Sequence, residues 1–311
     1  MATKNMNMMK TYITIICTFI LHGSCYCQQD SQYTQYMYNT ANVNPAYAGS
    51  RGTLTAFLLH RNQWVGLDGA PVTNNFTVNS PLGDSNFGIG VSFTNDKIGP
   101  TSENEISADL AYFIQISENY KLSLGLKGTA NLFNLDVNKL TIYDPLDPQF
   151  QNVDTEFSPN VGAGLYLFSE NTYVGLSVPN FFESYRYNDN NVAITKEKIH
   201  FYFIAGHVFE LNPNLKFKPA LMTKVVEGSP LQADITANFL LFDKLTLGAA
   251  YRWDAAVSGL AGFQISDSWF IGYGYDMDTT NLRNYNSGSH EIFLRFELFN
   301  RVNKLVSPRF F

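Results

Sequence analysis

Histidine, cysteine and carboxylate side chains could carry catalysis or bind a metal, but in this chain they are scattered. Histidines beyond residue 28 are isolated in the sequence, and none forms a close metal-ligand pair: His60, His200, His207 and His290. His200 and His207 are seven residues apart, so in one strand they would face opposite sides. We therefore expect polar lumen or rim histidines. The sequence predicts no catalytic, cofactor-binding or metal-binding residues.

Two further patterns could bind ligands. Carboxylates gather in the stretch 135–157 and could bind a calcium ion: Asp144, Asp147, Asp154 and Glu156. Their spacing matches no standard calcium loop, which favours a solvated acidic loop. Three glycine pairs resemble fragments of a dinucleotide loop: Gly88 and Gly90, Gly162 and Gly164, Gly272 and Gly274. None has a third glycine followed by a helix pattern, so we interpret them as strand glycines that allow curvature and close packing.

The stretch that organises the rest of the chain is an alternating hairpin between Glu105 and Asn131. Apolar side chains occupy every second position on both sides of the turn Ser117–Asn119, which indicates two antiparallel strands with one apolar face. The other face carries Asp109 and Lys127. Each strand is about as long as the ~9–11 residues that cross a bilayer obliquely.

This pattern recurs along the chain and predicts an even number of strands. The segments are 53–61, 72–80, 87–95, 106–116, 121–132, 161–168, 172–178, 199–210, 215–226, 231–241, 244–253, 256–265, 269–275 and 290–299. Connections between them alternate between short turns and longer loops, which we expect at 62–71, 96–104, 135–157, 181–198 and 276–289. Short turns on one rim and long loops on the other are typical of outer-membrane barrels.

We therefore expect an all-β fold, a transmembrane antiparallel β-barrel of about 14 strands with both termini periplasmic. A soluble sandwich or propeller would also show alternation, but so many strands seldom share one soluble sheet. A barrel of this size encloses more space than wall side chains fill, so the lumen should hold water, a plug or a partner segment. Charged residues of the polar face should pair with one another, or hold a plug or a passing chain: Asp109, Lys121, Lys127, Asp234, Arg252, Glu291, Arg295 and Glu297.

The N-terminus has the pattern of a secretory signal peptide, residues 1–27. Its apolar run 11–21 is too short to span a membrane, and a lipidated Cys25 is the alternative to cleavage after Cys27. All cysteines lie in this segment. The remaining chain has 19 basic and 27 acidic residues, a net charge of −8, which argues against a nucleic-acid partner.

The predicted organisation has three parts after the signal peptide. Residues 28–52 form a polar and aromatic segment without a recognisable element, which we place at the periplasmic rim. Residues 53–299 form the barrel, surrounded by outer-membrane lipid, and residues 300–311 a periplasmic tail.

Several motifs resemble the PorP/SprF family of the type IX secretion system, found in Bacteroidota. They span the chain after the signal peptide: Gln28-Gln29, Gln35–Asn39, Asn44–Gly52, Arg61–Gly66, Gly69–Pro71, Asp96–Pro100, Gly162–Tyr166, Val174–Asn180, Gly288–Ile292 and Ser307–Phe311.

The resemblance implies a non-enzymatic outer-membrane component of protein secretion and gliding motility. Its implied partners are the lipoproteins of a periplasmic ring and a secreted cargo or the C-terminal domain of an adhesin. Members of the PorP kind support general secretion, and those of the SprF kind serve one surface adhesin. Two alternatives remain open: a general diffusion channel or lipophile transporter, and a barrel enzyme, which would need a catalytic set that the isolated histidines do not supply.

Overall fold

The computed structural model describes residues 33–140, 153–183, 185–187, 193–196 and 198–298. Strands dominate, and the wall is made by β1 (Leu54–Asn62), β2 (Val72–Pro81), β3 (Phe87–Ile98), β4 (Thr101–Gln115), β5 (Lys121–Leu135), β6 (Val153–Phe168), β7 (Thr172–Val178), β10 (His200–His207), β11 (Phe209–Asn212), β12 (Leu215–Val226), β13 (Gln232–Leu241), β14 (Leu245–Arg252), β15 (Ala256–Gln264), β16 (Trp269–Asp278) and β17 (Ser289–Leu298). A separate pair is β8 (Tyr185–Tyr187) and β9 (Ala193–Lys196). The 3-10 turns are η1 (Thr40–Asn42), η2 (Pro45–Tyr47), η3 (Val137–Lys139) and η4 (Asn281–Asn284).

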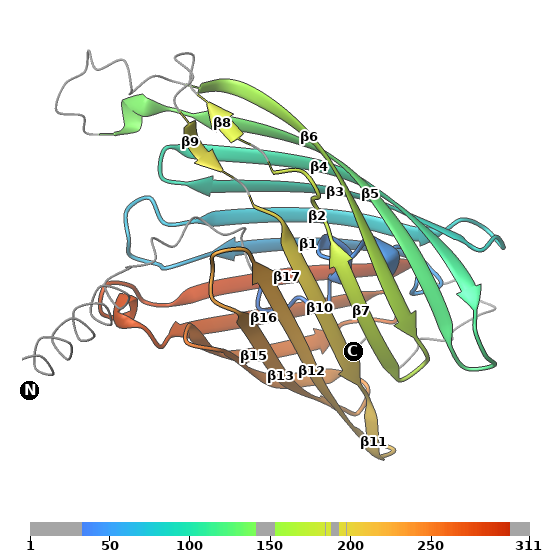
Figure 1. The fold of residues 1–311 in the computed structure, drawn as a ribbon. Helices are drawn as coiled ribbons and strands as arrows, with labels where there is room; N and C mark the ends of the chain where they lie inside the picture. The colour runs from blue at the N-terminus through green and yellow to red at the C-terminus, as the bar shows by residue number, and fades with distance from the viewer. Residues whose placement is uncertain (1–32, 141–152, 184, 188–192, 197, 299–311) are drawn as a thin grey trace, which may run out of the picture.

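The sheet closes into an antiparallel barrel (Figure 1). Consecutive strands pair, β1 pairs with β17, and the pairing of β10 with β12 completes the ring. β10 and β11 are two parts of one strand interrupted at Val208, so the fifteen labelled strands of the sheet correspond to fourteen strands of the barrel. The predicted antiparallel barrel of about 14 strands is confirmed.

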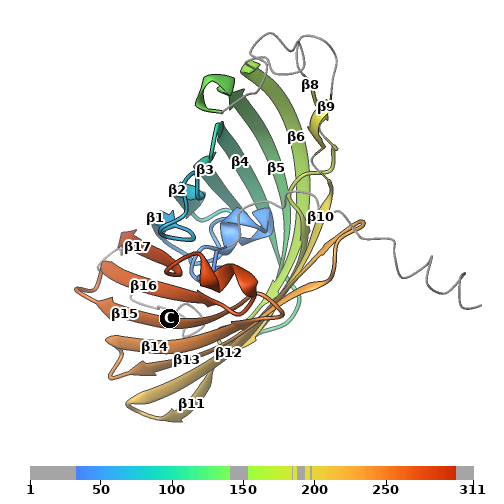
Figure 2. The ribbon, with the colours of Figure 1, turned by 90° about the vertical axis from the view of Figure 1, so that its left-hand side faces the viewer.

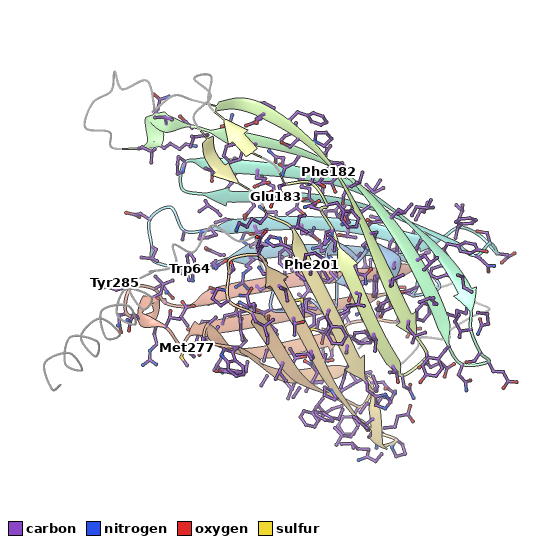
Figure 3. The ribbon with its side chains drawn as sticks, in the orientation of Figure 1. Trp64, Phe182, Glu183, Phe201, Met277 and Tyr285 are labelled. Carbon is purple, nitrogen blue, oxygen red and sulfur yellow. The ribbon has the colours of Figure 1, made fainter. Side chains whose placement is uncertain are left out.

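Alternation along each strand sorts side chains between two environments, as the sequence predicts. In β4 and β5, Ile106, Leu110 and Leu126 are exposed on the outside, whereas Asp109 and Lys127 are buried inside. Phe201 of β10 and Met277 of β16, labelled in Figure 3, are likewise exposed on the outer surface. The apolar belt and the polar interior are the arrangement that a bilayer requires.

The two rims of the barrel differ, and we name them by their connections. The short-turn rim carries the turns that follow β2, β4, β6, β11, β13 and β15, beginning with the turn between Pro81 and Phe87. The long-loop rim carries the remaining connections, including the loop between β1 and β2 and the loop with η4. No helix among the described residues is long and apolar enough to cross a membrane.

Three predicted loops differ from the expected ones. Residues 96–104 are not a loop, because β3 and β4 continue to Ile98 and from Thr101 and turn only at Gly99-Pro100. The long acidic loop ends earlier than predicted, since β6 begins at Val153. The loop 181–198 contains β8 and β9. In the first two cases cross-strand pairing extends past the point where apolar alternation ends, since backbone hydrogen bonds do not depend on side-chain polarity.

The largest correction concerns the N-terminal segment. Residues 33–52 are not confined to one rim but run inside the barrel, where most of them are buried (Figure 2, blue). They pack with wall residues in one interior cluster that includes Tyr38, Tyr47, Tyr166 and Phe293. Residues 28–32, the signal peptide 1–27 and the tail 300–311 lie outside the described residues.

Candidate functional site

The occupied lumen is the candidate functional site, and we call residues 33–52 the plug. Thr34 contacts Asp276 and Glu291, close to the long-loop ends of β16 and β17. Arg51 contacts Glu297, next to the short-turn end of β17. The plug therefore runs along the lumen from one rim to the other before the chain enters β1.

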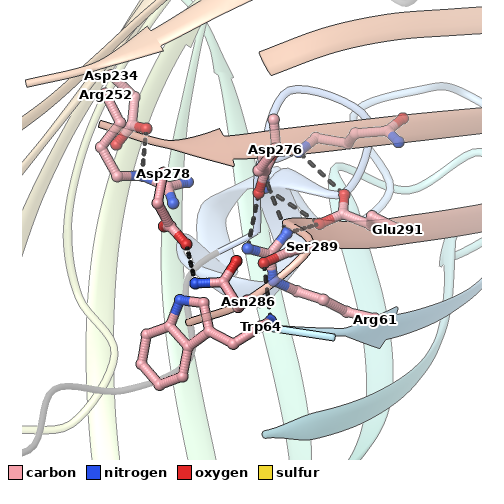
Figure 4. Close-up of polar contacts among 11 residues, drawn as sticks. Arg61, Trp64, Asp234, Arg252, Asp276, Asp278, Asn286, Ser289 and Glu291 are labelled. Atoms are coloured by element: carbon pink, nitrogen blue, oxygen red, sulfur yellow. Dashed lines mark hydrogen bonds and ion pairs between the residues drawn. The ribbon is translucent and has the colours of Figure 1, made fainter. Parts of the chain in front are cut away.

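A cluster of buried charges holds the long-loop end of the plug (Figure 4). Arg61 of β1 forms ion pairs with Asp276 (2.7 Å) and Glu291 (2.9 Å). The Glu291 carboxylate also accepts the backbone N–H groups of Thr34 (3.2 Å) and Gln35 (3.1 Å). The Thr34 hydroxyl donates to Asp276 at 2.7 Å. Both carboxylates thus bind Arg61 and the plug, Glu291 through plug backbone N–H groups and Asp276 through the Thr34 hydroxyl. Hydrogen bonds to charged groups of this kind are stronger than those between neutral groups.

Amide and hydroxyl groups hold the middle of the plug. Asn39 donates to the side chain of Asn75 on β2 at 2.9 Å, and Asn75 donates to Asn42 at 3.2 Å. Lys127 of β5 reaches the carbonyl of Ala41 at 3.4 Å and lies 3.6 Å from Asp109. The bond from Lys127 satisfies a backbone carbonyl of the plug, and the bonds among Asn39, Asn42 and Asn75 satisfy side-chain amides that lie in the lumen.

Asn44, Pro45 and Gly49 of the motif Asn44–Gly49 each have a structural reason. Asn44 accepts the N–H of Ala46 at 3.0 Å and so caps η2, while its amide donates to the Leu165 carbonyl of β6 at 3.0 Å. Pro45 begins η2, where the missing N–H costs nothing. Gly49 has φ +74° and ends the turn, a conformation that favours glycine.

Wall glycines make room for this motif. A methyl group on Gly125 would overlap the backbone nitrogen of Ala46, and one on Gly88 would overlap the Ala48 carbonyl. One on Gly164 would overlap the side-chain oxygen of Asn44. The interpretation of Gly88 and Gly164 as close-packing glycines is confirmed, and the surface that they approach is the plug.

Aromatic side chains seal the plug against the wall. Tyr38 packs against Phe293 and Phe270, with ring centroids at 4.9 and 5.6 Å, and the ammonium of Lys218 lies 5.4 Å from its ring centroid. Tyr47 packs edge-on against Tyr166 at 5.7 Å. Such contacts stabilise beyond the area they bury. The interior is therefore part polar network and part apolar core.

The short-turn end of the plug is held by Arg51, which bonds to the Glu297 carboxylate. Glu297 also lies 3.8 Å from Arg295. Beyond Arg51, a cavity of about 570 Å³ opens at the short-turn rim, with Ser50–Gly52 among its lining residues.

The predicted lumenal charges mostly pair as expected. Arg252 bonds to Asp234 at 2.7 Å, Lys127 faces Asp109, and Glu291 and Glu297 hold the plug. Lys121 is exposed at the short-turn rim and lines the cavity. Arg61, Arg51 and Asp276 also bind in the lumen and were not among the predicted lumenal charges. Arg61 lies on the inward face of β1, in alternation with the outward-facing residues. This place in the alternation is the sequence feature from which its position in the lumen could have been predicted.

The predicted histidines lie apart and bond to neutral groups. His60 contacts Asn74 at 2.8 Å, His207 contacts Thr172 at 2.7 Å and His290 contacts Tyr273 at 2.6 Å. His200 is buried near Tyr202. The described residues contain no group of three or more histidine, cysteine, aspartate or glutamate side chains that could hold a metal ion. Asp144, Asp147 and the Asp154 side chain lie outside the described part of the chain.

Comparison with known families gives one match. Residues 26–296, which include the plug and nearly the whole barrel, match the model described as type IX secretion system membrane protein PorP/SprF. No curated protein matches the chain at a significant level.

Solved structures with a similar chain path have little sequence in common with this one. Omp33 of Acinetobacter baumannii has a TM-score of 0.48 at 8% identity, covering 80% of this chain and 100% of its own. The toluene transporter TbuX of Ralstonia pickettii has a TM-score of 0.49 at 10% identity, covering 84% and 92%. The monoaromatic hydrocarbon channel CymD has a TM-score of 0.49 at 12% identity, covering 86% and 94%. These likenesses concern the fold alone.

Proposed function

The chain belongs to the PorP/SprF family of type IX secretion system membrane proteins, and we propose that it acts there as a closed, non-enzymatic platform in the outer membrane. In this function it supports export or cell-surface attachment of a cargo protein, such as an adhesin. It works with the lipoprotein ring on the periplasmic side. The short-turn rim then faces the periplasm, as in other barrels with short periplasmic turns.

The observation that carries this proposal is the plug. It bonds to β1, β2, β5, β6, β7, β16 and β17, and buried aromatic side chains fill the space between. Solutes passing through the lumen would have to displace these contacts. A diffusion channel or lipophile transporter, the alternative function, needs a continuous open route instead.

The fit between plug and wall also supports a permanent closure. A mobile gate needs a wall that is stable without its occupant. Here Gly88, Gly125 and Gly164 would expose wall backbone to an empty lumen, and Glu291 would lose two donors. Such buried groups are costly when left without partners. The barrel therefore offers its partners two rims and an outer belt rather than a pore.

Surface display of a cargo tests the secretion function directly. Deletion of the gene should abolish display of an adhesin exported by the type IX system, measured by surface immunolabelling, while total adhesin in the cell remains detectable. Complementation with the wild-type gene should restore display. Normal display in the deletion strain would contradict the proposal.

Conductance separates the closed platform from a diffusion channel. The purified protein should be silent in planar bilayers, whereas a variant lacking residues 33–50 should conduct if it folds, because the lumen is then open. Folding of the variant is checked by its strand content in circular dichroism. A stable conductance of the wild-type protein would favour the channel.

A further inference from the structure

The outer face of β16, β17 and β1 to β4 changes in polarity close to the long-loop rim. On these neighbouring strands (Figure 1), residues that alternate with buried ones point outward, and cross-strand pairing aligns them in rows. One such row, which we call the apolar row, consists of Ile271, Leu294, Leu58, Phe76, Phe93 and Ile106. Its side chains are all hydrocarbon, as a lipid-facing belt requires.

The next two outward rows towards the long-loop rim are mostly polar. The first boundary row consists of Tyr273, Ile292, His60, Asn74, Asn95 and Asn104. The second boundary row consists of Tyr275, His290, Asn62, Val72, Lys97 and Ser102. The outer face thus changes from hydrocarbon to amide, imidazole and phenol groups within one step of two residues along each strand.

The height of this step places the boundary rows in the headgroup layer of the membrane. Two residues along a strand rise about 7 Å, which is about 5 Å along the membrane normal at a strand tilt of about 40°. The interfacial layer on each side of the hydrocarbon is about 5–8 Å thick. The first boundary row therefore lies within this layer, and the second at its outer limit. Tyr273 and Tyr275 fit this depth, because tyrosine is enriched at membrane interfaces.

Charge is distributed unequally between the two faces of the wall at this level. The inward row between the two boundary rows contains three carboxylates, those of Glu291, Asp96 and Glu103. The boundary rows contain no carboxylate, and their lysine, Lys97, is exposed. The exposed Asp68 belongs to the loop between β1 and β2, beyond the second boundary row. An outer face with a lysine and without carboxylates is complementary to an anionic headgroup.

The amides of the first boundary row can both donate and accept hydrogen bonds. Asn74 is bonded to His60 through its carbonyl oxygen at 2.8 Å, which leaves both of its N–H groups. Among the described side chains, Asn95 donates one N–H to Asn104 at 2.8 Å, which leaves its second N–H and its carbonyl oxygen. Sugar hydroxyl groups need donors and acceptors side by side, whereas an ionised phosphate only accepts. The row therefore suits a sugar.

From the sharp boundary, the outward amides and the absence of outward carboxylates, we propose that this face binds the phosphorylated sugar headgroup of an outer-leaflet glycolipid. Asn74, Asn95 and Asn104 bond to sugar hydroxyl groups, Lys97 binds a phosphate, and the acyl chains lie against the apolar row. The inference rests on the proposed function for placing the long-loop rim at the cell surface, and hence this lipid in the outer leaflet.

Binding of lipid A, an acylated and phosphorylated disaccharide, tests the site. The purified protein is mixed in micelles with lipid A, dephosphorylated lipid A or phosphatidylglycerol, and native mass spectrometry gives the apparent Kd of each lipid. Lipid A should bind about fivefold or more tightly than phosphatidylglycerol, because even one additional hydrogen bond contributes about that factor. Equal affinities for these two lipids would overturn the recognition of a sugar.

Lys97→Gln tests the phosphate contact. It should weaken binding of lipid A about fivefold, as expected for one lysine near an anionic headgroup, and leave dephosphorylated lipid A within about twofold. The matched control is Lys244→Gln, because Lys244 is exposed between β13 and β14 at the short-turn rim. A loss of the same size in both variants, or for both forms of lipid A, would overturn the site.

Asn95→Leu tests the amide row. Loss of the amide should weaken binding of lipid A about fivefold, whereas Asn95→Gln keeps an amide and should stay within about twofold of the wild type. Circular dichroism checks that both variants retain their strand content. An Asn95→Leu variant that folds and binds lipid A as the wild type does would contradict the proposal.

The outcomes separate this proposal from the secretion function. Absence of lipid A binding, with cargo display that still depends on the gene, would overturn the lipid site alone. Lipid A binding that responds to Lys97→Gln, with normal display in the deletion strain, would instead overturn the secretion function alone.

Discussion

Glycines in the wall decide how closely the plug can approach. Gly125 and Gly128 lie three residues apart on β5, but Gly125 faces Ala46 and Gly128 has open space around it. The two positions share a strand and differ in what a methyl group would meet. They therefore separate the contact with the plug from the general effect of a side chain in a strand.

Gly125→Ala should destabilise the folded protein by about 1–3 kcal/mol, because the added methyl group overpacks the interface with Ala46. Gly128→Ala should change stability by less than about 0.5 kcal/mol, as expected for an open position. Denaturant unfolding of both variants in lipid vesicles measures the difference. Equal stabilities would mean that the plug does not press on β5.

Arg61 is the cation between two buried carboxylates, and its removal leaves Asp276 and Glu291 without their ion pair. Arg61→Met should therefore cost about 3–5 kcal/mol of unfolding free energy. The control is Lys139→Met, which breaks a solvent-exposed pair with Asp136 and should cost less than about 1 kcal/mol. Denaturant unfolding compares the two, and an equal loss would argue that Arg61 is not the anchor.

Side-chain roles were predictable where they followed alternation. Lys127, Arg252 and Glu291 were expected in the lumen, because a strand with one apolar face must turn its charges to the other. That Glu291 binds the backbone of Thr34 could not be predicted. The two residues are 257 positions apart, and no local pattern links them.

At the scale of elements, the β4–β5 hairpin is the unit from which the wall is built. Leu126 is 63% exposed on its outer face, well inside the span of β5. This side chain should face hydrocarbon. The short turn after β4 lies at one rim, so Leu122 on the same strand lies closer to the membrane interface.

Leu126→Arg should cost about 2–4 kcal/mol, because the charge would lie near the membrane midplane, whereas Leu122→Arg should cost about 0–1 kcal/mol near the interface. Leu124→Arg should behave like Leu126→Arg. Folding yield and unfolding in vesicles measure these costs. An arginine at Leu126 that assembles as well as one at Leu122 would contradict the membrane placement.

Elements were predictable in proportion to their periodicity. The strands alternate, and their pairing followed from their order in the chain. The plug has no period: its two 3-10 turns are each three residues long, and its order comes from the wall. Asn, Tyr and Gly in Asn39–Gly49 indicated a packed polar segment, but not that the barrel surrounds it.

At the scale of the whole molecule, the plug follows a path that differs from the predicted position of this segment at the periplasmic rim. An even number of strands puts the start of β1 at the short-turn rim, and the sequence therefore suggested that the preceding segment stays there. The plug instead carries the chain to the opposite rim, where Thr34 meets Asp276 and Glu291. Closure and strand number were predictable from alternation, but this path was not.

Cysteine labelling tests the path, using a chain whose described residues contain no cysteine. With the short turns in the periplasm, Tyr33→Cys should react in intact cells with a membrane-impermeant maleimide. Gly52→Cys should react only after the outer membrane is permeabilised. Tyr285→Cys and Asn119→Cys serve as markers of the long-loop and short-turn rims. Labelling of Tyr33→Cys under the same conditions as Asn119→Cys would contradict a plug that runs from rim to rim.

The glycines that face the plug also restrict how the sequence can diverge. Gly88, Gly125 and Gly164 are required only while Ala48, Ala46 and Asn44 occupy the space before them. Wall and plug positions should therefore co-vary among relatives, although they are distant in the chain. In a lineage that lost the plug, selection on these glycines would relax and side chains would return. Their retention in a relative would then be an inherited mark of an occupied lumen, readable from sequence alone.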